Sequence, residues 1–204
     1  GNSFFSERHI TTLANRVEFL CFMLISMTQT IHFVRHGEVH NPEKILYGQQ
    51  PGWRLSDRGQ EMAKVIGQWS SNLNLGAIHA SPLQRAQETA APIIAKHNLP
   101  LTTDNNLIEA ANIFEGKKFE LGNGILRHPK SWPYLWNPWR PSWGEPYDQL
   151  ISRMLKALFT ARDSAAGKDA ICVSHQLPIW ILRSAVEGRR LLHDPRKREC
   201  TLAS

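Results

Sequence analysis

Short apolar runs alternate with longer amphipathic segments along this chain from residue 30 onward. The short runs have the length of β-strands and are, in chain order, Ile31–Val34, Ala77–Ala80, Leu101–Thr103 and Ala170–Ser174. The last run is apolar throughout, as expected of a central strand buried on both faces. Between the runs, apolar residues recur at helical spacing, which predicts helices at Asp57–Trp69, after Pro82, from Pro146 to Gly167 and from Pro178. Strands alternating with helices predict an α/β fold, a three-layer sandwich with a mostly parallel central sheet and helices on both faces.

Several element ends carry residues with known positional preferences. Ser56 stands immediately before the first predicted helix and is expected to cap it. Ser81 is expected to cap the second helix, with Pro82 at its first helical position. Pro92 lies inside this helix and is expected to kink it. Residues Cys200–Ala203 are expected to form a last strand.

Two segments depart from the alternation. Residues 1–26 include most of an apolar stretch, VEFLCFMLISM, and are expected to be an N-terminal extension (a tag scar, a mis-called start or an extra helix) on a main domain of residues 27–204. The segment at about 112–147 is a long irregular insertion rich in tryptophan and proline. Long loops in compact domains are usually functional or disordered, and the many aromatics argue against disorder. We expect a lid over a site, and a satellite packing cluster is the alternative.

Composition adds limits on the class of protein. With 42% hydrophobic and 21% charged residues the chain has an ordinary globular composition. Its formal net charge of +6 suits an anionic partner. The three cysteines, Cys21, Cys172 and Cys200, are scattered, which indicates reduced thiols and a cytoplasmic location rather than a disulfide framework. No run approaches the ~18 apolar residues of a membrane span, so none is expected.

The candidate chemistry lies where the predicted strands end. Arg35 and His36 follow the first strand, Arg85 follows the second, and His175 follows the apolar strand near the end of the chain. Ligands of open α/β sheets bind at this edge. Arginine matches the oxygens of a phosphate and stays charged, and a neutral imidazole can attack phosphorus. These residue types therefore predict a pocket for a phosphoryl group that needs no metal.

A metal site is the competing interpretation of the histidines. His32, His36 and His40 recur at a spacing of four residues. No cluster of acidic ligands accompanies them, so no metal is expected.

Three motifs in this order resemble the histidine phosphatase superfamily, which includes the cofactor-dependent phosphoglycerate mutases. They are Arg35-His36-Gly37-Glu38, the S-P-L-x-R-A-x-x-T-A run at 81–90 and Val173-Ser174-His175, with an L-S-x-x-G-x-x-x-A run at 55–63. The resemblance covers roughly residues 30–182. It implies a phosphoglycerate mutase-like fold, with His36 as the phosphorylated nucleophile and Arg35, Arg85 and His175 around the phosphate. It also implies catalysis without a bound cofactor.

Further residues are carried over less directly. Asn41 resembles the asparagine that contacts the phosphate after the first motif, although its spacing is one residue short. Glu109 resembles the proton donor, a carboxylic acid that protonates the leaving alcohol and then activates water. Glu115 is its rival, because the segment after Glu109 lacks the familiar glycine. Gln176 replaces the glycine that usually follows the second histidine.

The resemblance favours a phosphomonoester hydrolase that acts through a phosphohistidine on a small phosphorylated metabolite. A cofactor-dependent phosphoglycerate mutase is the first alternative. A noncatalytic protein that binds phosphorylated ligands, or RNA through the basic C-terminal region, is the second. No aromatic RNA-binding signature accompanies these basic residues, so a nucleic-acid partner is not expected. The sequence does not identify the physiological substrate. It is compatible with a homodimer.

Overall fold

The structure is a computed structural model that describes residues 29–112, 115–116, 144–191 and 200–204. Its elements in chain order are β1 (Ile31–Arg35), α2 (Asp57–Ser70), β2 (Leu75–Ala80), α3 (Gln84–His97), β3 (Leu101–Thr103), the 3-10 helix η1 (Asn105–Leu107), α5 (Tyr147–Ser164), β4 (Asp169–Ser174) and α6 (Gln176–Val186). The predicted helices and the first four predicted strands are all present.

The four strands form one sheet in the order β1-β4-β2-β3, and every neighbouring pair is parallel. β4 lies between β1 and β2, and five of its six residues are buried. Its side chains alternate between two cores: Ala170 and Cys172 belong to one, Ile171 and Val173 to the other. This alternation explains why residues 170–173 of β4 form a continuous apolar run.

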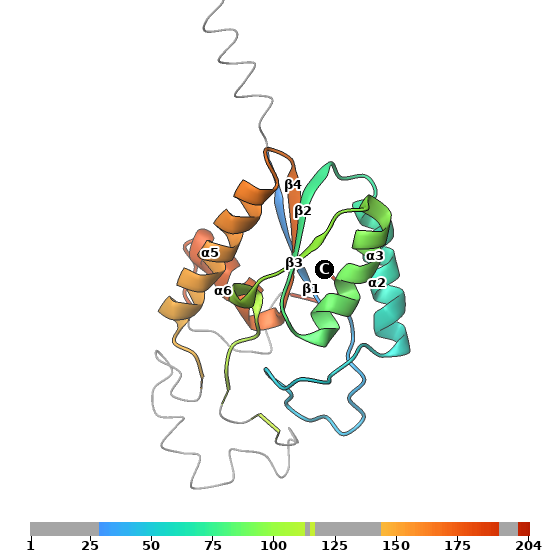
Figure 1. The fold of residues 1–204 in the computed structure, drawn as a ribbon. Helices are drawn as coiled ribbons and strands as arrows, with labels where there is room; N and C mark the ends of the chain where they lie inside the picture. Colours follow the sequence, from blue (N-terminus) through green and yellow to red (C-terminus); the bar gives the residue numbers. More distant parts are fainter. Residues whose placement is uncertain (1–28, 113–114, 117–143, 192–199) are drawn as a thin grey trace, which may run out of the picture.

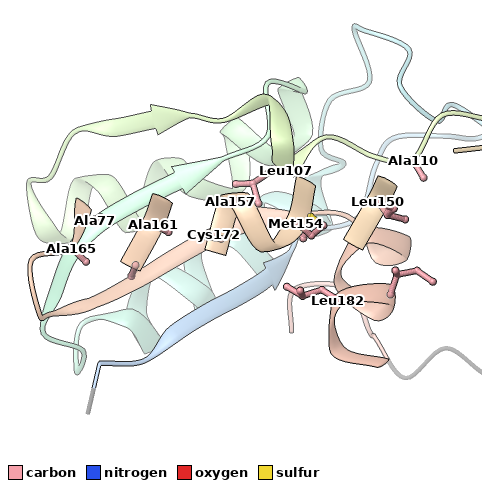
Figure 2. Close-up of a cluster of buried hydrophobic side chains, with 12 residues drawn as sticks. Ala77, Leu107, Ala110, Leu150, Met154, Ala157, Ala161, Ala165, Cys172 and Leu182 are labelled. Atoms are coloured by element: carbon pink, nitrogen blue, oxygen red, sulfur yellow. The ribbon is translucent and has the colours of Figure 1, made fainter. Parts of the chain in front are cut away.

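Helices cover both faces of the sheet, as Figure 1 shows: α5 and α6 lie on one side, α2 and α3 on the other. The core under α5 contains Leu150, Met154 and Ala157 of this helix together with Cys172 of β4 (Figure 2). The core on the opposite face includes Ile78 of β2 and contributions from α2 and α3. The predicted three-layer α/β fold is therefore confirmed.

The helix starts were predicted with mixed success. Ser56 caps α2 as expected, because its side chain accepts a hydrogen bond from the backbone N–H of Gly59. The prediction for Ser81 is wrong: α3 begins only at Gln84, and its N-cap residue is Leu83, which makes no side-chain cap. α6 begins before Pro178, which occupies the first turn, where backbone N–H groups have no intrahelical partner in any case.

The C-terminal residues contact β1 without forming the expected strand. Residues 200–204 have no strand assignment. Their carbonyls nevertheless bind Arg35: the backbone N–H of Arg35 donates to the oxygen of Ser204 at 3.0 Å, and Nη1 donates to the oxygen of Cys200 at 2.8 Å. A strand would require a ladder of such backbone bonds, and a single backbone bond does not make one.

Two sequence predictions fall mainly outside the described residues. The N-terminal extension lies wholly there, and so does nearly all of the insertion at 112–147. At the base of the insertion, Asn112 and Gly144 form an isolated antiparallel bridge. Within the described ranges, no helix has the length and apolar character needed to cross a membrane.

Candidate active site

The carboxyl ends of three neighbouring strands meet at one edge of the sheet. β1 ends at Arg35 and is followed by His36, and β4 is followed directly by His175. β2 is followed by Ser81, and Arg85 lies in the first turn of α3 just beyond. Because β4 separates β1 from β2, these residues converge from both sides of the central strand. The edge is the one at which open α/β sheets bind ligands.

His36 is held as a neutral imidazole with a defined tautomer. It is 2% exposed, and its Nδ1 lies 2.7 Å from the carbonyl oxygen of Gly37. A carbonyl oxygen only accepts, so Nδ1 carries the proton and Nε2 carries the lone pair. Burial, followed by the positive charge of Arg85, lowers the pKa of His36 from 6.5 to about 3. The imidazole therefore has a free nucleophilic nitrogen at neutral pH.

The peptide of Gly37, which sets this tautomer, is itself fixed. Its N–H donates to Oγ1 of Thr89 at 3.0 Å, and the hydroxyl of Thr89 donates to the carbonyl of Arg85 at 2.7 Å. A Cβ added to Gly37 would lie 2.7 Å from the backbone oxygen of Gly59 in the first turns of α2. Only glycine permits this close approach.

Arg85 is a fully buried cation. Its Nη2 donates to the carbonyl oxygen of Gly48 at 2.6 Å, and its guanidinium carbon lies 4.6 Å from the ring centroid of Tyr47. Its Nε has no hydrogen-bond partner. Burial lowers the pKa of Arg85, but a guanidinium stays protonated in proteins. The buried charge is therefore held in place with donor capacity left over.

His175 faces His36 across the site. It is fully buried, and the two ring centroids are 5.1 Å apart with an interplanar angle of 59°. Its Nε2 lies 2.7 Å from Oγ of Ser81. Burial, together with His36 and Arg85, holds the pKa of His175 well below its ordinary value. This histidine is therefore also neutral.

Unpartnered side-chain nitrogens gather at this edge of the sheet. In the described part of the chain six buried side-chain nitrogen or oxygen atoms lack a hydrogen-bond partner, and three of them belong to this site: Nε of Arg35, Nε of Arg85 and Nδ1 of His175. Buried polar groups are normally satisfied, so a cluster of exceptions needs an explanation. Two guanidinium groups and an imidazole around a neutral nucleophile are suited to an anion such as a phosphoryl group.

Asn41 and the two candidate acids, Glu109 and Glu115, differ in the groups with which they interact. The side-chain amide of Asn41 is committed to a local turn, with both its oxygen and its nitrogen bonded to the backbone of Ile45 at 2.9 and 2.8 Å. Oε1 of Glu109 accepts from the N–H of Ala110 at 2.9 Å. The charges of Glu109 and Glu115 both act to raise the pKa of Arg85, so both carboxylates lie within electrostatic range of this guanidinium.

Three residues at the site were not predicted from the sequence to belong to it. Ser81 and Thr89 are the two hydroxyl residues of the run at 81–90, so a close interpretation of that motif would have found them. Tyr47 precedes Gly48 without any pattern that marks it. Its ring lies on Arg85 and contacts the ring of Trp53 at a centroid distance of 5.2 Å.

The histidines that suggested a metal site do not converge. The ring of His32 packs edge-on against Trp69 at 5.3 Å, whereas His36 is buried at the strand edge and His40 is exposed. Across the described ranges, no three His, Cys, Asp or Glu side chains are grouped so that they could hold a metal ion.

The fold and the site together define an α/β protein in which arginine and imidazole side chains gather around a buried histidine at the carboxyl edge of the sheet. Residues 31–204 match the family model described as the histidine phosphatase superfamily, branch 1. The chain belongs to this superfamily, and the resemblance stated from its motifs is confirmed.

Known proteins of this kind resemble the chain to different degrees. The uncharacterized protein Rv0525 of Mycobacterium tuberculosis is 53% identical over 174 residues, 85% of this chain and 86% of that protein. The probable phosphoglycerate mutase GpmB of Salmonella choleraesuis is 26% identical over 185 residues, 85% and 82% of the two chains. The solved structure of Bacillus stearothermophilus YhfR has a TM-score of 0.69 and 27% identity, covering 81% of this chain and 83% of that one.

Proposed function

We propose that this protein is a phosphomonoester hydrolase that forms a phosphohistidine at His36 and needs no metal. One observation carries the proposal: His36 is buried, neutral and protonated at Nδ1, and it lies beside three unpartnered nitrogens that belong to Arg35, Arg85 and His175. A neutral nucleophile beside fixed cations meets the two needs of phosphoryl transfer, positioning and neutralisation of charge.

The reaction proceeds in two balanced steps. In the first, Nε2 of His36 attacks phosphorus, a P–N bond forms and the P–O bond to the alcohol breaks, while the carboxyl group of Glu109 gives the leaving oxygen a proton. In the second, water attacks phosphorus and gives a proton to the carboxylate of Glu109, and the electrons of the breaking P–N bond return to Nε2. The carbonyl of Gly37 stabilises the intermediate, because phosphorylation makes the Nδ1–H a more acidic donor.

Arg35, Arg85 and His175 bind the phosphoryl oxygens in this proposal. Their nitrogens are already fixed by other contacts: Arg35 by the carbonyl of Cys200, Arg85 by that of Gly48 and His175 by Ser81. Donors held in place before the reaction need no reorganisation as charge moves to the equatorial oxygens. Asn41 has a secondary part here, because its amide shapes the turn that precedes Tyr47 and Gly48.

A phosphoglycerate mutase, which would also form a phosphohistidine, is the alternative. The relative named a probable phosphoglycerate mutase supports it. A mutase also needs cations for the second anionic end of its substrate. The charge of Arg153 reaches His175, but its guanidinium is bonded to both oxygens of Glu145 at 2.7 and 2.8 Å and to the carbonyl of Asn106 at 2.6 Å. Within the described ranges, this arginine is thus already neutralised and not available to a second anionic group, which supports hydrolysis.

A coupled assay separates the two activities. Conversion of 3-phosphoglycerate to 2-phosphoglycerate is followed with 2,3-bisphosphoglycerate present, beside release of inorganic phosphate. Phosphate release that dominates over isomerisation supports the hydrolase, and the reverse overturns it. A noncatalytic role, with phosphorylated ligands or RNA bound and no turnover, is tested by a phosphatase panel run with RNA filter binding.

The nucleophile is tested by trapping the intermediate. Enzyme is mixed with a labelled phosphomonoester and denatured in alkaline detergent, and the label is expected on His36 with the stability of a phosphohistidine: lost in acid and kept in alkali. His36→Ala should carry no label, whereas His40→Ala, which removes an exposed histidine of the same loop, should label normally. Label retained in His36→Ala would show that another residue is the nucleophile.

A further inference from the structure

The hydroxyl of Ser81 is fixed at the end of β2 by the backbone around it. The N–H of Ser81 donates to the carbonyl of Val173 in β4 at 3.0 Å, and its own carbonyl accepts from Nε2 of Gln87 at 2.6 Å. The residue is fully buried. Its side chain therefore meets protein groups and not solvent.

Two groups surround Oγ of Ser81. The backbone N–H of Leu83 donates to it at 3.3 Å, and Nε2 of His175 lies 2.7 Å away. Within the part of the chain that the structure describes, this oxygen has no third hydrogen-bond partner. Because Leu83 supplies a donor, Nε2 of His175 is the one described group that can accept the hydroxyl proton.

We propose that Ser81 is a positioning residue that fixes His175 in the tautomer protonated at Nδ1, so that this N–H is the donor offered to the phosphoryl group. The inference rests on the proposed function for the identity of the ligand. In this tautomer the one unpartnered group is the Nδ1–H, which a phosphate oxygen satisfies. In the other tautomer both the buried hydroxyl proton and the Nδ1 lone pair are unpartnered, and the lone pair faces an anion.

The two neutral histidines then have complementary roles. The carbonyl of Gly37 holds His36 as a nucleophile with its lone pair on Nε2, and Ser81 holds His175 as a hydrogen-bond donor. Both imidazoles are uncharged, so their functions are set by tautomer and not by protonation state. The motif at 81–90 supplies Ser81 for one histidine, and for the other it supplies Thr89, which binds the Gly37 peptide.

The fold offers a matched control elsewhere. Nε2 of His79 lies 2.8 Å from Oγ of Ser164, almost the distance of the Ser81 pair. There the hydroxyl of Ser164 donates to the carbonyl of Ala161 at 3.0 Å, so it accepts from Nε2–H of His79. The same pair of side chains therefore stabilises the opposite tautomer, and Ser164→Ala removes a serine–histidine bond away from the proposed site.

The tautomer can be measured without turnover. Two-bond 1H–15N spectra of uniformly 15N-labelled protein distinguish a protonated ring nitrogen from a bare one, and the His175 signals are assigned by their loss in His175→Gln. We expect wild-type His175 to be protonated at Nδ1 and bare at Nε2, and His79 to show the reverse. A wild-type His175 protonated at Nε2 overturns the proposal, whatever the outcome of the phosphohistidine trap.

A binding experiment tests the consequence. Inorganic phosphate is titrated into wild type, Ser81→Ala, Ser81→Thr and Ser164→Ala by calorimetry. Ser81→Ala should bind phosphate about tenfold more weakly, which equals about 1.4 kcal/mol, with an Nε2–H form of His175 appearing in its spectrum. Ser81→Thr keeps the hydroxyl and should retain both the tautomer and the affinity, and Ser164→Ala should retain the affinity. Unchanged His175 signals in a folded Ser81→Ala would refute the role of Ser81.

Discussion

The neutral state of His36 predicts a specific dependence of stability on pH. Burial and Arg85 lower its pKa from 6.5 to about 3 in the folded protein. As the pH falls, the His36 imidazole is therefore protonated near pH 6.5 in the unfolded chain but only near pH 3 in the folded protein. Stability is fully present above the unfolded value and is lost as the pH falls toward the folded one.

The size of the effect follows from that shift. Each pKa unit corresponds to about 1.4 kcal/mol, so the whole shift represents about 5 kcal/mol. Between pH 7 and pH 4 only the part from 6.5 down to 4 is expressed, which is about 3 kcal/mol. His36→Gln removes this proton uptake. On going from pH 7 to pH 4, wild type should therefore lose about 3 kcal/mol more unfolding free energy than the variant.

Urea unfolding at several pH values between 7 and 4 measures this difference. Wild type and His36→Gln are compared at each pH, and His40→Gln serves as the control because it removes an exposed histidine from the same loop. The unfolding free energies of wild type and His40→Gln should fall in parallel as the pH is lowered. That of His36→Gln should fall less. Parallel behaviour of all three proteins would mean that His36 is not a buried neutral base.

Two further predictions concern the reaction itself. Phosphatase activity should persist in excess EDTA and be inhibited by vanadate, which mimics five-coordinate phosphorus; activity lost on chelation and restored by added metal contradicts this. Glu109→Gln should lower turnover much more for alkyl phosphates than for p-nitrophenyl phosphate, because nitrophenolate leaves without needing a proton. Equal losses on both substrates argue against Glu109 as the acid, and a selective loss in Glu115→Gln instead transfers the role to that residue.

The sequence was most informative where one local rule acts without competition. The apolar run of β4 could be predicted because both its faces are buried, and Ser56 could be predicted as a cap because its hydroxyl oxygen can accept from Gly59 while its proton goes to Glu38. Ser81 has the same side chain in a similar position, yet it does not cap α3. Its hydroxyl binds His175, 94 residues away in the sequence, and a local pattern cannot register such a partner.

The hydrogen bonds and ring contacts of side chains within the site could not be predicted from the sequence either. The phosphate contact of Asn41 stays a prediction, and the sequence did not reveal that its amide also binds the backbone of Ile45 four residues on, a turn that asparagine readily makes. The contact between Tyr47 and Arg85 depends on how a loop folds over α3, for which the sequence has no periodic signal. Motifs identified the residues at the strand ends, but not their mutual contacts.

The central place of β4 in the sheet has a consequence for synthesis of the protein. His36, Arg35 and Arg85 are all made within the first half of the chain, but the strand that lies between β1 and β2 begins only at Asp169. Until the ribosome has added that strand, β1 and β2 have no shared neighbour, and His175 does not yet exist. A nascent chain therefore carries His36 and both arginines without the scaffold that aligns them. The proposed activity would then require the whole chain through His175, so chains released before that point are expected to be inactive toward phosphomonoesters.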